Sequence, residues 1–188
     1  MTRQKSQKVA TAVITTIAII VILPIIFVIG FLVYNGIGAI SWEFLSQPPR
    51  NGMTEGGLLP AILGTIFLTL GTAVAAIPLG IGAAIYLAEY AGNNRLTRII
   101  RLAIVNLAGI PSIVYGLFGL GAFVLFLNFG TSILAGSLTL GIMTLPVLIS
   151  TAEEAIRSVP ADFRVVSLSL GATRWQTIRH QVLPHALP

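Results

Sequence analysis

The 188-residue chain is 55% hydrophobic and only 9% charged, which excludes an ordinary soluble domain, in which about 25% of residues are charged. This composition indicates a membrane protein, and the net charge of +5 does not indicate nucleic-acid binding, because no alternation of aromatic and basic residues forms a binding face. The absence of cysteine excludes disulfides, thiolate metal sites and cysteine nucleophiles.

Residues 9–33 form an uninterrupted apolar segment of 25 residues. As a helix it would be about 37 Å long, which exceeds the roughly 30 Å hydrocarbon core of a bilayer. Basic residues precede it, as in a cleaved signal peptide, but it is about twice the usual apolar length and lacks a small-residue cleavage site. We therefore predict a retained transmembrane helix. The Gly- and Pro-rich residues 35–57 predict an extramembrane loop, with Trp42 and Phe44 at the membrane interface.

The second apolar segment covers residues 58–87. Mostly small residues recur in it at steps of three, four or seven and predict a seam that another helix can approach closely. The seam residues are Ala61, Gly64, Leu68, Gly71, Ala75 and Gly82. Beside them, Thr65, Thr69 and Thr72 either line a polar path or donate hydrogen bonds to carbonyls one turn earlier. The spacing does not separate these two alternatives.

The third apolar segment, residues 99–127, contains Pro111. Proline lacks an N–H and its ring crowds the carbonyl four residues earlier, so we predict a bend or break near the middle of the membrane. The side chains of Asn106 and Ser112 are expected to satisfy some of the freed carbonyls. Because broken helices are common in transporters, Asn106, Gly109, Pro111 and Ser112 are candidates for the translocation path.

The fourth apolar segment covers residues 131–150, and Glu153, Glu154 and Arg157 follow it. Glu153 and Arg157 are four residues apart, so we expect them to pair on one helix face. The three residues form either a solvated helix end or a gate of the exit path. A proton-coupled carrier usually buries an acid near the midplane, and this sequence shows almost no ionisable residue there. We therefore expect the energy for transport to come from another subunit.

Basic residues set the expected orientation, because cytoplasmic segments collect arginine and lysine. Every basic residue except Arg50 lies in the N-terminal tail, the loop between the second and third segments, or the C-terminal segment. We predict a multi-pass protein of the cytoplasmic (inner) membrane with a cytoplasmic N-terminus. Its fold class is all-α, a polytopic membrane helix bundle. Residues 1–57 supply the first helix and an extracytoplasmic loop, and residues 58–188 the core.

The C-terminal segment predicts two short helices joined by a glycine elbow. A helix over residues 161–170 would carry Phe163, Val166 and Leu170 on one apolar edge. Gly171 can adopt the left-handed conformation that ends it. Thr173 and Gln176 then form a capping-box pattern that opens a second helix, which Leu183 and Pro184 are expected to end. The pair of helices could lie on the membrane surface, but it is better suited to a partner's cleft.

Gly171, followed by Leu183 and Pro184, resembles the cytoplasmic loop motif of ABC importer permeases. The Glu-Ala-Ala positions of that motif hold Val165, Val166 and Ser167, so the family's glutamate is missing. Longer strings are similar to the permease subunits of phosphate ABC transporters. They are LLPAILGTIFLTL (58–70), IPLGIGAAIYLAEYA (77–91), NLAGIPSIVYGLFGL (106–120), EEAIRSVPADFR (153–164) and LSLGATRWQTIRHQVLPHALP (168–188).

This resemblance implies an ABC importer permease (MetI-like) fold in which four of about six transmembrane helices are present, so we expect a truncated chain. It implies coupling to a separate ATPase through the loop 161–184. The coupling residues are expected to be Phe163, Val166, Ser167, Leu170, Gly171, Ala172, Thr173 and Trp175.

By the same resemblance, the expected substrate is inorganic phosphate. The expected partners are an ABC ATPase dimer, a second homologous permease subunit, an extracytoplasmic phosphate-binding protein and membrane lipid. The chain is expected to hold no cofactor, metal site or catalytic residue, since it has no P-loop motif and its two histidines point to different faces of a helix. The alternative function is a self-sufficient secondary transporter or channel for a small solute.

Overall fold

The computed structural model describes residues 3–186, without the side chains of residues 3–6, 9, 10 and 53. The side chains of Arg3 and Lys5 in the basic tail, and Pro188, where truncation is expected, lie outside the described residues. The chain divides into two compact units after Ile62. Each unit is described separately below.

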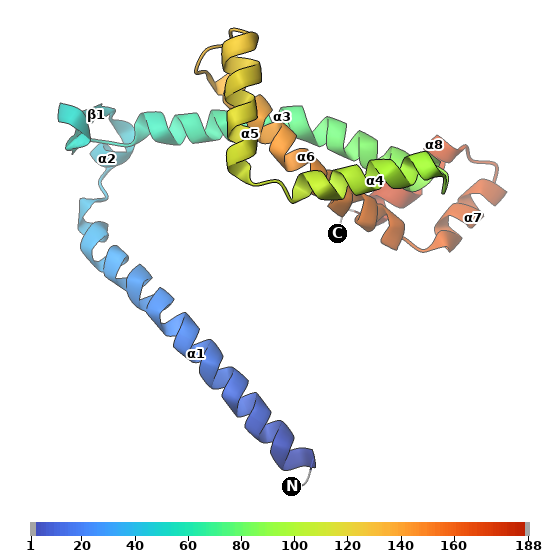
Figure 1. Cartoon of the computed structure of the whole chain (residues 1–188), viewed down its shortest axis with the longest axis horizontal. Helices are drawn as coiled ribbons and strands as arrows, with labels where there is room; N and C mark the ends of the chain where they lie inside the picture. The colour runs from blue at the N-terminus through green and yellow to red at the C-terminus, as the bar shows by residue number, and fades with distance from the viewer. Residues whose placement is uncertain (1–2, 187–188) are drawn as a thin grey trace. The chain divides into compact units, whose positions relative to one another are not determined.

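The first unit begins with α1 (Arg3–Gly36), a continuous helix that is long and apolar enough to cross a membrane (Figure 1). The helix predicted over residues 9–33 is therefore confirmed. Its apolar side chains are exposed all round; Phe27, for example, is 69% exposed. A helix that is apolar on every face fits a lipid environment rather than one side of a soluble core.

The predicted extramembrane loop is more ordered than its glycines and prolines indicate. It contains a 3₁₀ turn (Ile37–Ala39), α2 (Trp42–Ser46), a second 3₁₀ turn (Asn51–Met53) and an antiparallel pair of two-residue strands, β1 (Pro49–Arg50) and β2 (Glu55–Gly56). Ser41 caps α2, because its hydroxyl accepts a hydrogen bond from the Phe44 N–H at 3.1 Å. Gly57 lies so close to the carbonyls of Phe44 and Gln47 that a side chain would not fit.

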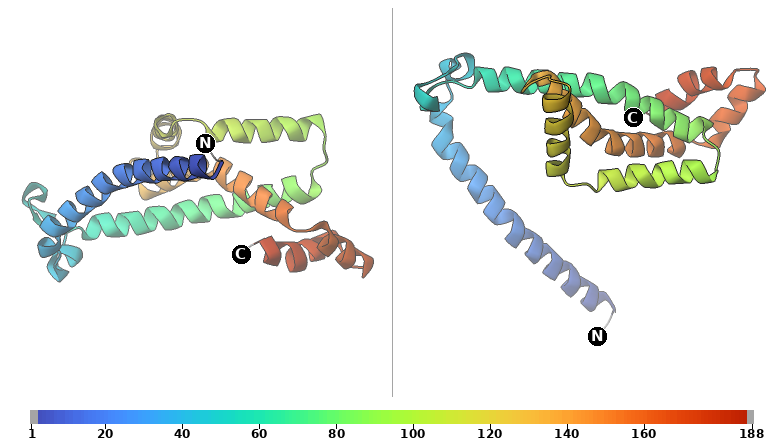
Figure 2. Two further views of the ribbon diagram at one scale, coloured as in Figure 1. Left: turned by 90° about the horizontal axis from the view of Figure 1, so that it is seen from below. Right: turned by 45° about the horizontal axis from the view of Figure 1, so that its top comes forward.

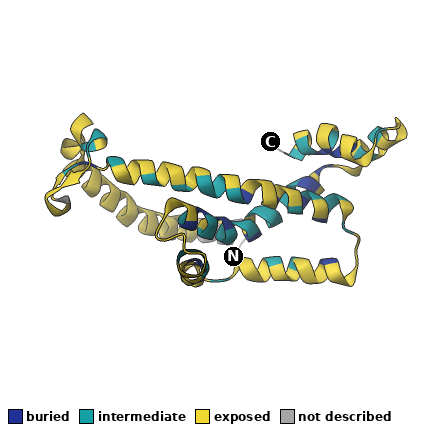
Figure 3. Ribbon diagram, turned by 90° about the horizontal axis from the view of Figure 1, so that it is seen from above, coloured by how far each residue is buried: buried dark blue, intermediate teal, exposed yellow. Residues whose placement is uncertain are grey.

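The second unit is built around α3 (Leu59–Ile85) and α6 (Ile133–Ser158), both long and apolar enough to span a membrane. A π-helical segment, η3 (Tyr86–Tyr90), continues α3. The right-hand view of Figure 2 shows α6 between α3 and α4 (Arg95–Ala108), and Figure 3 shows buried residues in dark blue where these helices lie together. The second and fourth predicted helices are confirmed, and α6 carries the charged residues after 150 within its last turns.

The third predicted helix is two helices rather than one. After α4, the chain turns by 96° into α5 (Ser112–Gly119), which continues as the π-helical segment η4 (Leu120–Phe126). The predicted break at Pro111 is confirmed, and Figure 1 shows α5 crossing the direction of α4. The chain therefore has three helices of spanning length, or four if the bent pair is one span, within residues 3–186.

Small residues bring α3 and α6 together over the central part of the predicted seam. A side chain on Gly71 would collide with Ser137, and one on Gly141 would lie 3.4 Å from Ala75. The ends of the seam are different, because nothing lies within 4 Å of the corresponding positions at Gly64 and Gly82. The prediction is therefore confirmed at the centre of α3, and at Gly64 and Gly82 no described residue approaches the helix.

The C-terminal segment forms α7 (Ala161–Ser169), α8 (Arg174–Thr177), the π-helical segment η5 (Ile178–Val182) and α9 (Leu183–Ala186). The predicted end at Leu183 and Pro184 is wrong, because helical turns continue to Ala186. In the wider π turn, the Leu183 N–H donates a hydrogen bond to the Ile178 carbonyl. Pro184 then lies in the first turn of α9, where proline is tolerated because its missing N–H is not needed. The hydrophobic core of this region contains Ala84, Ile156, Val159 and Val182.

Candidate functional site

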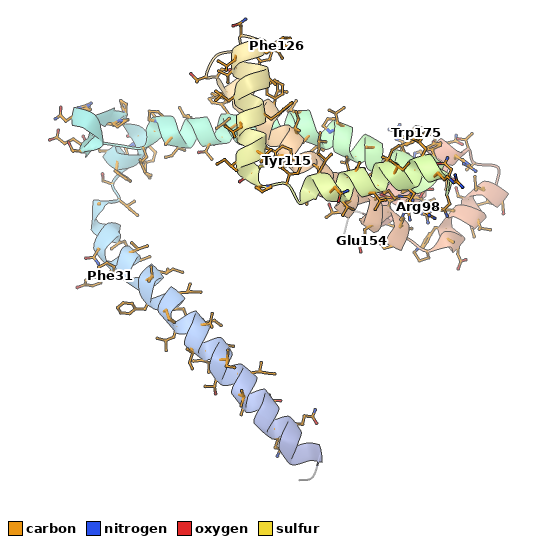
Figure 4. The ribbon with its side chains drawn as sticks, viewed as in Figure 1. Phe31, Arg98, Tyr115, Phe126, Glu154 and Trp175 are labelled. Atoms are coloured by element: carbon orange, nitrogen blue, oxygen red, sulfur yellow. The ribbon has the colours of Figure 1, made fainter. Side chains whose placement is uncertain are left out.

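The break between α4 and α5 leaves the carbonyl of Leu107 without its usual helical partner, because Pro111 has no N–H. Tyr115, a buried residue one turn further on, donates its hydroxyl to that carbonyl at 2.9 Å (Figure 4). The Ile110 N–H donates to the same oxygen at 3.1 Å. The expectation that Asn106 and Ser112 would supply these bonds is wrong: within the described residues, neither side chain makes a hydrogen bond.

The four break residues proposed for the path lie on the surface of the single chain. Asn106, Gly109, Pro111 and Ser112 are all exposed. Asn106 lies in the last turn of α4 and the other three follow that helix, whereas Arg101, in the middle of α4, contacts the charged cluster described next. The structure therefore does not bring the break and the charged cluster into one site.

Glu153 connects three helical elements of the second unit. Its side chain is 11% exposed, and its Oε1 atom accepts from Arg101 Nε and from Arg157 Nη2, each at 2.9 Å. Arg101 also donates from Nη2 to the Leu87 carbonyl at 2.9 Å, at the end of the α3 region. The expected pair of Glu153 and Arg157 is confirmed. Glu153 is not a solvated helix end, whereas Glu154 is exposed (Figure 4).

Arg164 on α7 makes the largest set of polar contacts of any side chain described here. Its Nε and Nη2 atoms donate to Glu89 Oε1 at 2.9 and 2.6 Å, and the two side chains are 22% and 12% exposed. Nη1 donates to the Val159 carbonyl at 2.7 Å, and Nη2 to the Ile156 carbonyl at 2.8 Å. These carbonyls belong to the C-terminal end of α6, where a cation is favoured.

The Arg164 cluster fixes α7 to the ends of the long helices, and the Glu153 cluster joins those helices to α4. Arg164 joins α7 to η3 and to the last turn of α6, and Glu153 joins α6 to α4. Charged hydrogen bonds of this kind are short and directional, so they resist sliding between the elements that they connect. These contacts hold α7 against η3 and the last turn of α6.

The elbow after α7 has the predicted geometry. Gly171 has a φ of +85°, a left-handed conformation that favours glycine, although no described residue lies within 4 Å of the place that a side chain would occupy. The capping box is present: Gln176 Oε1 accepts from the Thr173 N–H at 2.8 Å, and the Gln176 N–H donates to the Thr173 hydroxyl at 3.3 Å. The hydroxyls of Ser167 and Thr177 share a hydrogen bond of 2.9 Å across the elbow.

Five of the residues expected to contact an ATPase line one groove of about 400 Å³, together with Asp162 and Gln181. They are Phe163, Val166, Ser167, Leu170 and Ala172. Leu170 is 83% exposed, and Trp175 nearby on α8 is 52% exposed. A groove with an exposed apolar rim on a polar segment is a surface suited to a partner protein.

A second groove, of about 500 Å³, runs between α3 and α6. Thr65, Thr69 and Thr72 line it from α3, and Thr144 lines it from α6. The Thr72 hydroxyl is buried and has no hydrogen-bond partner among the described residues. Of the two alternatives left open for the threonines, the bond to a carbonyl one turn earlier is not realised at Thr72, which lines the groove.

Sequence reasoning missed Glu89, Arg101, Tyr115 and Arg164 as parts of the site. Arg101 and Arg164 were grouped with the loop charges, because their partners lie 52 and 75 residues away in the sequence. Glu89 follows directly after an apolar segment, and this position of an acidic residue is the sequence signal that could have indicated its role. Within the described residues, no group of three or more histidine, aspartate or glutamate side chains could hold a metal ion.

Comparisons with known proteins agree with this architecture. The family described as binding-protein-dependent transport system inner membrane component matches residues 76–188. The whole chain is 35% identical to the probable ABC transporter permease protein YqgI of Bacillus subtilis, and it spans 64% of that protein's length. The probable ABC transporter permease protein YqgH of the same organism is 39% identical over 92% of the chain and 58% of its own length. The phosphate transport system permease protein PstA 1 of Mycobacterium tuberculosis is 33% identical over 99% of the chain, which spans 62% of that protein.

Proposed function

Because the chain belongs to the family of binding-protein-dependent transport system inner membrane components, we propose that it is a membrane-spanning permease subunit of an ATP-driven ABC importer for inorganic phosphate. The relatives named as phosphate transport permeases support the substrate. The proposed partners are an ABC ATPase dimer, a second homologous permease subunit and an extracytoplasmic phosphate-binding protein. The subunit holds no ATPase site of its own.

The observation that carries this proposal is the attachment of the elbow to the long helices. The groove of α7 and the elbow offers an exposed apolar surface to an ATPase, and Arg164 links that surface to Glu89 and to the end of α6. Movement of an ATPase against α7 would then move α3 and α6 together. Rigid-body transmission of this kind is a common way in which a local event drives a large rearrangement.

The proposed path runs along the groove between α3 and α6. Four threonines line this groove, and the buried Thr72 hydroxyl has no partner within the described residues, so a small shift of the helices would let it bond water or a phosphate oxygen. The break at Asn106, Gly109, Pro111 and Ser112 is a further candidate for the path, and Glu153, Glu154 and Arg157 are candidates for the gate. In the proposed orientation the N-terminus and the elbow are cytoplasmic, because nearly all basic residues then lie inside.

The coupling proposal is tested by co-purifying the chain with the ATPase subunit of its transporter. Leu170→Glu places a charge on the most exposed apolar position of the groove without changing the backbone, so we expect co-purification to fall about tenfold or more. Gly171→Val is expected to do the same by opposing the positive φ, whereas Gly171→Asn should retain most of the binding, because asparagine tolerates that conformation. Unchanged binding in both Leu170→Glu and Gly171→Val would contradict the proposal.

The substrate is tested separately by phosphate uptake in cells that lack their own high-affinity phosphate permease. The assembled transporter should accumulate labelled phosphate only while ATP is available. Uptake that continues without the ATPase subunit would favour a self-sufficient transporter, and ATP-dependent uptake of another solute in place of phosphate would retain the coupling and reject the substrate.

A further inference from the structure

A polar cavity of about 390 Å³ lies at the start of α4, outside the elbow and the α3–α6 groove. Its lining residues are Asn93, Asn94, Arg98, Arg101, Leu102 and Val105. Two of the six are arginines and none is acidic. Because Arg101 is paired with Glu153, the uncompensated positive charge of this open cavity comes from Arg98.

The polar end of this cavity offers hydrogen-bond donors. Asn94 Oδ1 accepts from the Thr97 N–H at 2.8 Å and from the Thr97 hydroxyl at 3.0 Å, which leaves its amide nitrogen free to donate. Arg101 uses Nε for Glu153 and Nη2 for the Leu87 carbonyl, and its Nη1 atom has no partner among the described residues. Arg98 forms no ion pair within residues 3–186 and is exposed (Figure 4).

The apolar end of the cavity continues the same helix face. Arg98, Arg101, Leu102 and Val105 are spaced i, i+3, i+4 and i+7, so they form one stripe along α4. Leu102 and Val105 are 57% and 62% exposed. The stripe thus passes from guanidinium groups at the helix start to uncovered aliphatic side chains within two turns.

We propose that this stripe binds one anionic phospholipid, with its phosphate group between Arg98, Arg101 and the asparagine amides and an acyl chain along Leu102 and Val105. Arginine matches a phosphate group in geometry and charge, and basic residues at a membrane surface attract anionic lipids. A free phosphate ion has the same head-group chemistry, but it would leave the aliphatic half of the stripe unused. The proposal does not depend on which solute the transporter carries.

The test is retention of lipid by the 188-residue chain purified from mixed vesicles of phosphatidylglycerol and phosphatidylcholine, measured by native mass spectrometry. Arg98→Gln should lower retention of phosphatidylglycerol about tenfold, because hydrogen bonds to a charged group are lost. Arg95→Gln is the matched control: it removes the same charge one turn earlier, outside the cavity, and should change retention less than about twofold. Equal losses of phosphatidylglycerol retention in the two variants would show only nonspecific electrostatic attraction of lipid and would contradict a specific binding site.

A second arm separates lipid from free phosphate. Leu102→Gln removes the aliphatic contact and leaves both arginines, so it should lower lipid retention while binding of inorganic phosphate to delipidated chain stays unchanged. If Arg98→Gln abolishes binding of inorganic phosphate, and neither variant affects lipid retention, the cavity is a solute site and the lipid assignment is wrong. Loss of ATPase co-purification in these variants is not expected, so this test fails or succeeds independently of the proposed coupling.

Discussion

At the scale of single residues, the guanidinium of Arg164 connects α7 to η3 and to the end of α6. It satisfies the carboxylate of Glu89 and two carbonyls at the end of α6, all in a partly buried position. Breaking such an ion pair from one side is more costly than losing a surface pair, because the remaining charge stays buried without compensation. The Arg164 contacts therefore contribute to the stability with which α7 packs against the end of α6.

Arg164→Gln is expected to lower the free energy of unfolding by about 2 kcal/mol, because Glu89 loses its charged partner. The measurement is denaturant unfolding of the purified chain in detergent. Adding Glu89→Gln to Arg164→Gln should cost less than the sum of the two single changes, since both act on one contact. Strict additivity would argue that the pair contributes little, and the exposed Arg95→Gln should change stability by less than about 0.5 kcal/mol.

Tyr115→Phe removes a single hydroxyl from the helix break. The Leu107 carbonyl then keeps only the Ile110 N–H, so we expect stability to fall by about 1 kcal/mol. Tyr86→Phe is a suitable control, because Tyr86 is 59% exposed. The comparison uses the same unfolding measurement, and equal effects at the two tyrosines would contradict the role given to Tyr115.

At the scale of the elements, the close approach of α3 and α6 depends on a few small residues. Gly71→Ala would place a methyl group against Ser137, and overpacking of this kind costs about 1–3 kcal/mol. Gly64→Ala, at an open position of the same helix, should raise stability by up to about 1 kcal/mol through helix propensity. Thermal unfolding of the two variants side by side tests this, and a Gly71→Ala variant as stable as Gly64→Ala would contradict the packing.

Sequence reasoning located the elements because their signals are local. The apolar segments, Pro111, the capping box of Thr173 and the positive φ of Gly171 each depend on residues within about one turn. The contacts that join the elements could not be predicted in this way. The partners of Arg101 and Arg164 follow from which helices lie side by side, and a single sequence does not contain that information. For the same reason, the sequence predicted Asn106 as the donor to a freed carbonyl at the break, whereas Tyr115 donates that hydrogen bond.

At the scale of the whole molecule, the basic residues predict the side of the membrane on which each segment lies. The chain has no cysteine, so single cysteines can report this directly. Thr54→Cys, in the loop after α1, should react with a membrane-impermeant maleimide on intact cells. Arg179→Cys, in the elbow region, should react only after the membrane is permeabilised. The reverse pattern would place the elbow outside and would remove the basis for coupling to a cytoplasmic ATPase.

The shared carboxylate oxygen of Glu153 has a consequence for movement of α4. Arg157 lies on the same helix as Glu153, so this pair persists when Arg101 is withdrawn. A lone buried pair would leave a bare anion on separation, which costs about 3–5 kcal/mol. Here Glu153 keeps Arg157 as its cation throughout, so a movement of α4 away from α6 would leave no unpaired carboxylate and would cost less than breaking a lone pair.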